Sequence, residues 1–167
     1  MVPSRLRSPN SITTPVPNYG NLEQLPAPLR PLPFQAILKT EMPKKILVAE
    51  DEPGYLDLLQ ISLSTEGYEV IPVDNGSSAL KRAVEELPDL VLTDVRMPGL
   101  DGYHFAQSLA DALGARCPKI IIMTSRDTSS AREKGAAMMS GAHALVQKPF
   151  ELPELHAKIK ALLEEGS

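Results

Sequence analysis

The chain has very few aromatic residues and no tryptophan. Phe, Tyr and Trp make up 4% of its 167 residues, whereas 43% of the residues are hydrophobic. A stacking platform for nucleobases or a flavin is therefore not favoured. The hydrophobic content is sufficient for the core of one ordinary domain, and the length leaves room for an extension.

Cysteine and long apolar runs are also scarce. The single Cys117 excludes an internal disulfide and fits a reducing compartment. No segment approaches the roughly 18 consecutive apolar residues of a membrane span, and prolines interrupt the N-terminus, where a signal peptide would need a continuous apolar stretch. We therefore expect a soluble, cytoplasmic protein that does not insert into membranes.

Basic side chains are outnumbered in most of the chain. Residues 43–167 carry 13 basic and 19 acidic side chains, a net charge of −6, whereas residues 1–42 have a net charge of +2. Direct binding to nucleic acid is not expected, because it requires Lys and Arg to displace the counterions of the phosphate backbone.

The N-terminal segment differs in composition from the rest. Residues 1–42 contain eight of the 16 prolines and show neither helical nor strand periodicity. We expect this segment to be disordered or extended, with the folded domain at residues 43–167. Two interpretations of this segment remain open. It is a proline-rich tail that docks to another protein, or it is not translated because translation starts at Met42. Mass spectrometry of the native N-terminus distinguishes them.

A pattern of strand, turn and helix repeats five times after Lys44. Short apolar runs predict buried parallel strands at Lys45–Ala49, Glu69–Val73, Leu90–Asp94, Lys119–Thr124 and Ala144–Gln147. The helices are expected to begin at Pro53 and near Ser77, Gly102, Ser129 and Glu151. This alternation predicts an α/β fold, a doubly wound five-stranded parallel sheet with helices on both faces.

Polar side chains gather where four of these strands end. They are Glu50, Asp51 and Glu52 after the first strand, Asp94 on the third, Thr124 on the fourth and Lys148 after the fifth. The carboxyl ends of parallel strands meet at one edge. At an effective dielectric of ~20, two like charges ~4 Å apart repel by about 4 kcal/mol, so protons or a cation must relieve the acids. Oxygen-only ligands favour Mg²⁺ over Zn²⁺.

Other sites found on such folds do not match. The first turn reads Glu50-Asp51-Glu52-Pro53, which repels phosphate unless a divalent metal lies between them, and no glycine-rich phosphate loop occurs. A serine nucleophile is not indicated either, because Ser125 has no adjacent histidine.

Three segments together resemble the receiver domain of two-component response regulators, including the single-domain regulators of chemotaxis. They are Ile46–Pro53, Asp89–Gly102 and Lys148-Pro149-Phe150, and the resemblance extends from about Lys44 to Glu165. It implies a flavodoxin-like (βα)5 fold with strand order 2-1-3-4-5.

The resemblance also implies roles for individual residues. Asp94 would accept a phosphoryl group from a sensor histidine kinase or a phosphotransfer protein. Glu50, Asp51, Asp94 and the backbone carbonyl of Arg96 would hold Mg²⁺, for which Mn²⁺ can substitute. Thr124 and Lys148 would contact the phosphoryl group, and the Lys148–Pro149 peptide bond would be cis.

Some positions depart from the family pattern. Leu145 stands where most receivers have Tyr or Phe, so the usual aromatic readout of phosphorylation is missing, and Glu50 replaces the commoner Asp. Arg96 and Arg126 lie two residues beyond Asp94 and Thr124. We hypothesise that their bulk slows loss of the phosphoryl group.

We therefore expect a stand-alone receiver that is not an enzyme towards other substrates. It would signal by binding an unknown downstream protein or by relaying the phosphoryl group, and a homodimer would use the face of the fourth helix, fifth strand and fifth helix.

A pseudo-receiver scaffold that works without phosphorylation is the alternative: Leu145 favours it, and Asp94 and Lys148 oppose it. A phosphatase of the haloacid dehalogenase type is disfavoured, because it needs an aspartate where Arg96 stands.

The three histidines and the pair Met138-Met139 are not expected to take part in the site. No two of His104, His143 and His156 are spaced as a ligand pair, and we expect surface or packing positions for them. Met138 and Met139 could form an adaptable binding surface, but packing is the favoured interpretation.

Overall fold

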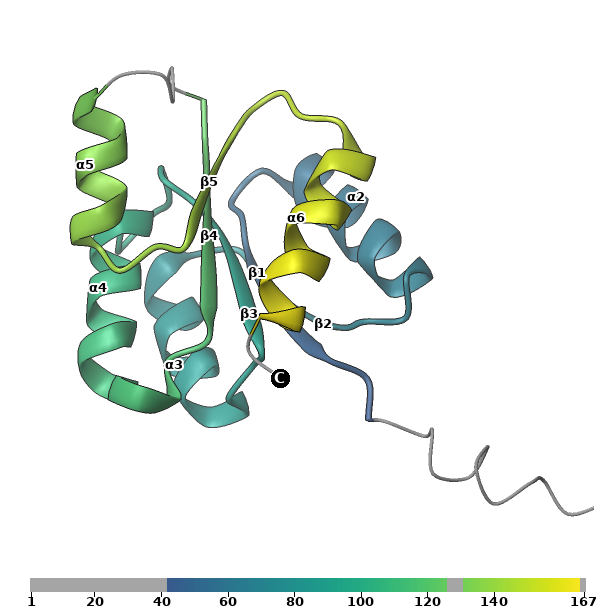
Figure 1. Ribbon diagram of the computed structural model, residues 1–167, viewed down its shortest axis with the longest axis horizontal. Coiled ribbons are helices and arrows are strands. Elements are labelled where there is room, and N and C mark those ends of the chain that lie inside the picture. The colour runs from purple at the N-terminus through teal and green to yellow at the C-terminus, as the bar shows by residue number, and fades with distance from the viewer. Residues whose placement is uncertain (1–41, 126–130, 166–167) are drawn as a thin grey trace, which may run out of the picture. The chain divides into compact units, whose positions relative to one another are not determined.

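The computed structural model describes residues 42–125 and 131–165. Five parallel strands form one sheet in the order β2-β1-β3-β4-β5 (Figure 1). Their bounds are β1 Lys45–Ala49, β2 Glu69–Val73, β3 Leu90–Asp94, β4 Lys119–Thr124 and β5 Ala144–Gln147. The predicted fold, strand order and strand bounds are thus confirmed. The prediction of a disordered segment at residues 1–42 lies, except for Met42, outside the described residues.

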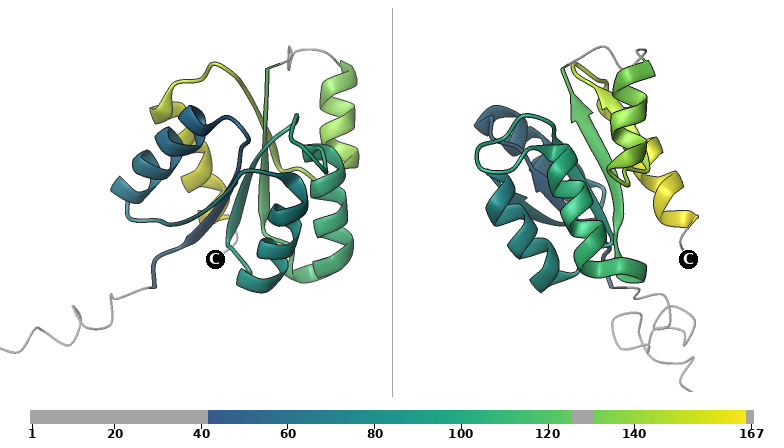
Figure 2. Two further views of the ribbon diagram at one scale, coloured as in Figure 1. Left: turned by 180° about the vertical axis from the view of Figure 1, so that it is seen from behind. Right: turned by 90° about the vertical axis from the view of Figure 1, so that its left-hand side faces the viewer.

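Helices cover both faces of the sheet. They are α2 Pro53–Thr65, α3 Gly76–Glu86, α4 Gly102–Leu113, α5 Ala131–Met139 and α6 Leu152–Glu164. Helices α2 and α6 lie on one face and α3, α4 and α5 on the other (Figures 1 and 2). The expected helix start near Ser129 falls in the undescribed gap, and the 3₁₀ turn η3 (Gly114–Arg116) was not predicted. Within the described ranges, no helix is long and apolar enough to cross a membrane.

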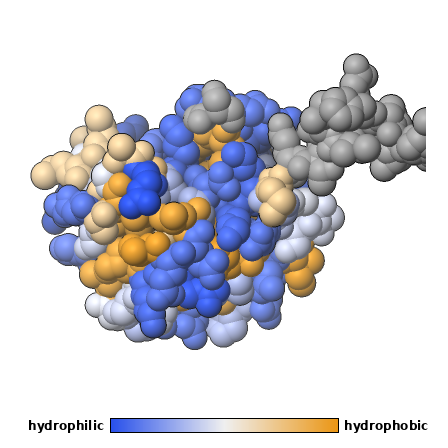
Figure 3. Space-filling model, turned by 90° about the horizontal axis from the view of Figure 1, so that it is seen from below, coloured by the Kyte–Doolittle hydropathy of each residue, from blue (hydrophilic) through white to orange (hydrophobic). Residues whose placement is uncertain are grey.

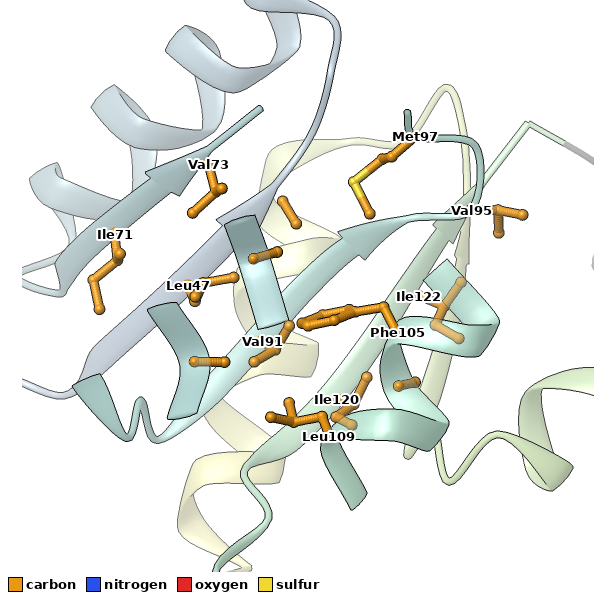
Figure 4. Close-up of a cluster of buried hydrophobic side chains, with 14 of the residues drawn as sticks. Leu47, Ile71, Val73, Val91, Val95, Met97, Phe105, Leu109, Ile120 and Ile122 are labelled. Carbon is orange, nitrogen blue, oxygen red and sulfur yellow. The ribbon is translucent and has the colours of Figure 1, made fainter. Parts of the chain in front are cut away.

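The two layers follow from side-chain alternation along the strands. In β1, Ile46 and Val48 belong to the core beneath α2 and α6, whereas Leu47 and Ala49 belong to the core beneath α3 and α4. Figure 4 shows the second core, where the fully buried Phe105 extends from α4 over the sheet towards Val91. Both faces of the central strands are buried, which explains their continuous apolar sequences.

The parallel register brings the polar strand ends together. Ala49 of β1 is level with Thr93 of β3, Asp94 with Met123 of β4, and Thr124 with Gln147 of β5. Each polar residue identified in the sequence therefore stands at the same edge of the sheet as the others.

Candidate functional site

Lys148 joins two acidic residues at this edge. Its Nζ lies 2.5 Å from Glu50 Oε2 and 2.7 Å from Asp94 Oδ1. The side chain of Glu50 is 1% exposed, and those of Asp94 and Lys148 are each 11% exposed. The ammonium also lies 4.5 Å from the centroid of the Tyr55 ring, which can stabilise it by a cation–π contact. The sequence therefore correctly predicted that β1, β3 and β5 contribute to one site.

Burial and charge act against each other in this cluster. Burial raises the pKa of Glu50, although Lys148 partly opposes the rise. Burial alone would lower the pKa of Lys148, but its hydrogen bonds to Asp94 and Glu50 and their charges outweigh that effect and raise it. A charged Lys148 is therefore a cation that reduces the repulsion between these acids, as the sequence predicted that protons or a cation must do.

Both carboxylate oxygens of Asp94 are held in place. Oδ1 accepts the hydrogen bond from Lys148, and Oδ2 accepts one from the backbone N–H of Arg96 at 2.5 Å. The exposed guanidinium of Arg96 donates to the hydroxyl of Ser125 at 3.0 Å. Arg126, the second arginine of our hypothesis, lies outside the described residues.

The loop that follows Asp94 turns back because of two glycines. Gly99 follows Met97 and Pro98 and has a φ of +85°, which glycine adopts without steric strain. The N–H of Gly102 donates to the carbonyl of Val95 at 2.9 Å, and a Cβ at Gly102 would clash with the backbone carbonyl of Asp94. This close approach places the start of α4 directly against the end of β3.

Thr124 and the Lys148–Pro149 bond lie at the ends of β4 and β5, the two strands that follow β3 in the sheet. Thr124 is 1% exposed at the end of β4, and its carbonyl accepts a 2.7 Å hydrogen bond from the backbone N–H of Lys148. The Lys148–Pro149 peptide bond is cis, as the family resemblance implied. The ends of β4 and β5 are thus tied together beside the acidic cluster.

Asp51 is exposed and faces a cleft. It lines an open cleft of about 580 Å³ together with Arg96, Asp101 and His104. Across residues 42–125 and 131–165, no three His, Cys, Asp or Glu side chains are grouped to hold a metal ion by themselves. The expected set of Glu50, Asp51, Asp94 and the Arg96 carbonyl offers only hard oxygen donors, and its three acids against one lysine leave a negative excess. This chemistry fits a hard divalent cation that keeps water ligands.

Several residues were missed or misjudged from the sequence, in the site and elsewhere. The contact of Tyr55 with Lys148 was not predicted, although its position one turn after the acidic segment was a usable signal. Leu145 is half-buried and packs against the core beneath α3 and α4. Met138 and Met139 are 80% and 85% exposed, so the packing interpretation was wrong for both.

Comparison with known proteins gives one consistent result. A profile of the response regulator receiver domain matches residues 46–160. The chain is 38% identical over 125 residues to the alkaline phosphatase synthesis transcriptional regulatory protein PhoP of Bacillus subtilis, covering 75% of this chain and 50% of the relative. It is 39% identical over 122 residues to the phosphate regulon transcriptional regulatory protein PhoB of Rhizobium meliloti, covering 73% and 53%. The chain thus spans about half the length of these curated relatives.

Solved structures give the same family. A CheY-like response regulator receiver domain protein from Methanospirillum hungatei superposes with a TM-score of 0.68 at 28% identity, over 74% of this chain and 95% of that one. A putative response regulator from Chloroflexus aurantiacus gives a TM-score of 0.67 at 30% identity, over 73% and 98%.

Proposed function

The chain belongs to the response regulator receiver family, and from this we propose that it accepts a phosphoryl group on Asp94. Receiver domains interact with histidine kinases or phosphotransfer proteins, so the proposed donor is a phosphohistidine of such a protein. The observation that carries the proposal is the environment of Asp94: a carboxylate at the end of β3, paired with Lys148 and oriented by the Arg96 N–H.

The transfer step follows from this geometry. An oxygen of Asp94 attacks the phosphorus, forming an O–P bond, while the P–N bond of the donor breaks and its electron pair stays on the imidazole. The Lys148 ammonium offsets negative charge on the phosphoryl oxygens. Thr124, at the adjacent strand end, is proposed to donate its hydroxyl to one of these oxygens.

Receiver domains generally bind Mg²⁺ at the acidic pocket. For this chain we assign the ion to Asp51, Asp94 and the backbone carbonyl of Arg96, with Glu50 contributing directly or through water. When bound, the metal offsets charge on the transferring group. Mn²⁺ takes oxygen ligands of the same kind and can substitute.

The readout is proposed to depend on protein contacts. A phosphoryl group adds about −1.5 to −2 charges at neutral pH and would shift an equilibrium between inactive and active states. Leu145 has no ring to reorient, so the change would pass through the backbone alone. An unknown downstream protein, or a second copy bound through the α5-β5-α6 face, would recognise it.

The test is phosphorylation by a small donor. Incubation with acetyl phosphate and Mg²⁺ should add one phosphoryl group to the intact mass, and Asp94→Asn should abolish the addition. Asp101→Asn is the matched control, because Asp101 lines the neighbouring cleft and Asn also caps helices; this variant should be phosphorylated normally. Absence of any adduct would contradict the proposal and leave the scaffold alternative.

The stand-alone arrangement, the cytoplasmic location and the lack of activity on other substrates also belong to this proposal. The mass of the native protein tests the first of these. A native species with a second folded domain would contradict it, and one that begins at Met42 would settle the N-terminal question.

A further inference from the structure

A second pocket lies at the opposite edge of the sheet, where the strands begin. It has a volume of about 320 Å³ and lies among the segments that lead into β1, β3, β4 and β5. Its basic side chains are Lys44, Arg116 and Lys119, and Pro118, Leu162 and Leu163 contribute apolar surface. Figure 3 views the molecule from this edge and shows hydrophilic side chains next to hydrophobic ones.

Two of the three cations in this pocket have no counter-ion among residues 42–125 and 131–165. Lys44 forms an ion pair with Asp89 at 3.1 Å. Within the described part of the chain, neither Arg116 nor Lys119 forms an ion pair or a side-chain hydrogen bond. Lys119 is half-buried, so its charge is less well solvated than that of an ordinary surface lysine. Unpaired cations in a pocket of an acidic domain favour an anionic ligand.

His143 adds a hydrogen-bond donor to the same pocket. Its Nδ1 accepts a 3.2 Å hydrogen bond from the backbone N–H of Ile120, so the ring hydrogen is placed on Nε2. Burial is the main cause that lowers the pKa of His143 below its ordinary value of 6.5; the charge of Lys119 adds to this effect, and the charge of Glu165 opposes it. The imidazole is therefore neutral at pH 7 and keeps its hydrogen on Nε2.

We propose that this pocket binds a small organic anion. A phosphate or carboxylate group would contact Arg116 and Lys119, and an apolar body about the size of one ring would lie against Leu162 and Leu163. Arg is suited to both groups, because its planar donors match two oxygens at once. The volume of about 320 Å³ is near the lower end of the usual range of ligand pockets, which begins at about 300 Å³. This site is separate from the acidic cluster and does not depend on phosphorylation.

An NMR titration of the full chain tests the proposal, with phenyl phosphate and benzoate as probes and phenol as the uncharged comparison. Either anion should shift the backbone amides of residues 115–119 and 143, with a Kd on the order of 1 mM, and phenol should not. A larger effect of phenyl phosphate would identify phosphate as the preferred group, and a larger effect of benzoate would identify carboxylate.

Variants show whether the two cations are responsible. Arg116→Gln/Lys119→Gln should raise the Kd at least about tenfold and keep a folded spectrum. The matched control is Lys81→Gln/Arg82→Gln, which removes the same charge from cations already paired with Glu85 and Glu86 and should leave the Kd unchanged. Binding that centres on Lys148, binding unaffected by the first pair of substitutions, or no binding at about 10 mM of either anion would overturn the proposal.

Discussion

The guanidinium of Arg96 donates a hydrogen bond to the hydroxyl of Ser125 at 3.0 Å and so links the loop after β3 to the end of β4. The backbone N–H of the same arginine holds Asp94 Oδ2. The side chain is exposed but anchored by Ser125 next to the proposed phosphoacceptor, and our hypothesis is that it hinders an incoming water molecule.

Arg96→Ala should consequently speed hydrolysis of the aspartyl phosphate. We expect a rate about three to ten times higher, equivalent to about 0.7–1.4 kcal/mol of barrier. The measurement is the decay of the phosphorylated intact mass after acetyl phosphate is removed. Ser125→Ala keeps the arginine but removes its anchor and should give an intermediate rate. An unchanged rate in Arg96→Ala would mean that the arginine does not restrict water.

Gly102→Ala should be strongly destabilising, because the new Cβ meets the carbonyl of Asp94 and the backbone there must move. We expect a loss of about 1–3 kcal/mol in the free energy of unfolding, measured by urea denaturation. Gly135→Ala in α5 is the control: a Cβ there meets nothing within 4 Å, and the substitution should stabilise by about 0.5–1 kcal/mol. Equal changes in the free energy of unfolding for the two variants would show that the close contact at Gly102 does not exclude a Cβ.

The fold and the meeting of the polar strand ends at one edge could be predicted from the sequence for a physical reason. The bounds of β1, β3 and β4 are set by apolar runs buried on both faces, and each run ends at or next to a polar residue that needs polar partners once it is buried. A parallel sheet then leaves only one edge for Glu50, Asp94 and Thr124.

Features that depend on three-dimensional contacts were not predictable. The ion pairs of Lys148 with Glu50 and Asp94 join residues far apart in the chain, and no local pattern reports them. The exposure of Met138 was misjudged because hydrophobic character alone does not determine which face of a short helix is covered. The 3₁₀ turn η3 follows α4 without a separate sequence signal.

Asp101 should make the free energy of unfolding of the domain vary with pH in the acidic range. Burial tends to raise its pKa, but hydrogen bonds from His104 and Tyr103 and the charge of His104 lower it below 3.8 overall. The pKa of Asp101 in the folded state is below its pKa in the unfolded state. Ionised Asp101 therefore stabilises the folded domain above about pH 3.8, and this stabilisation is lost as the pH falls through the folded-state pKa. The side chain is 43% exposed, so we expect less than about 1 kcal/mol.

Urea denaturation of the wild type and Asp101→Asn between pH 2.5 and 7 measures this contribution, using about six pH values to define the slope. The wild type should be the more stable protein at pH 7, and the difference should shrink as the pH falls. A difference that grows towards low pH would contradict the assignment. His104→Gln should reduce the difference, because it removes the imidazole that contacts the carboxylate at 2.5 Å.

Lys148→Met should destabilise the domain even without phosphorylation. The substitution leaves Glu50 and Asp94 close together, buried and without their shared counter-ion. Removing one partner of a buried ion pair typically lowers the free energy of unfolding by about 3 kcal/mol or more, which urea denaturation at neutral pH can measure. Glu50→Gln in the same background removes one of the two stranded charges and should restore part of the loss. A double variant no more stable than Lys148→Met alone would show that repulsion between these acids is not the cause.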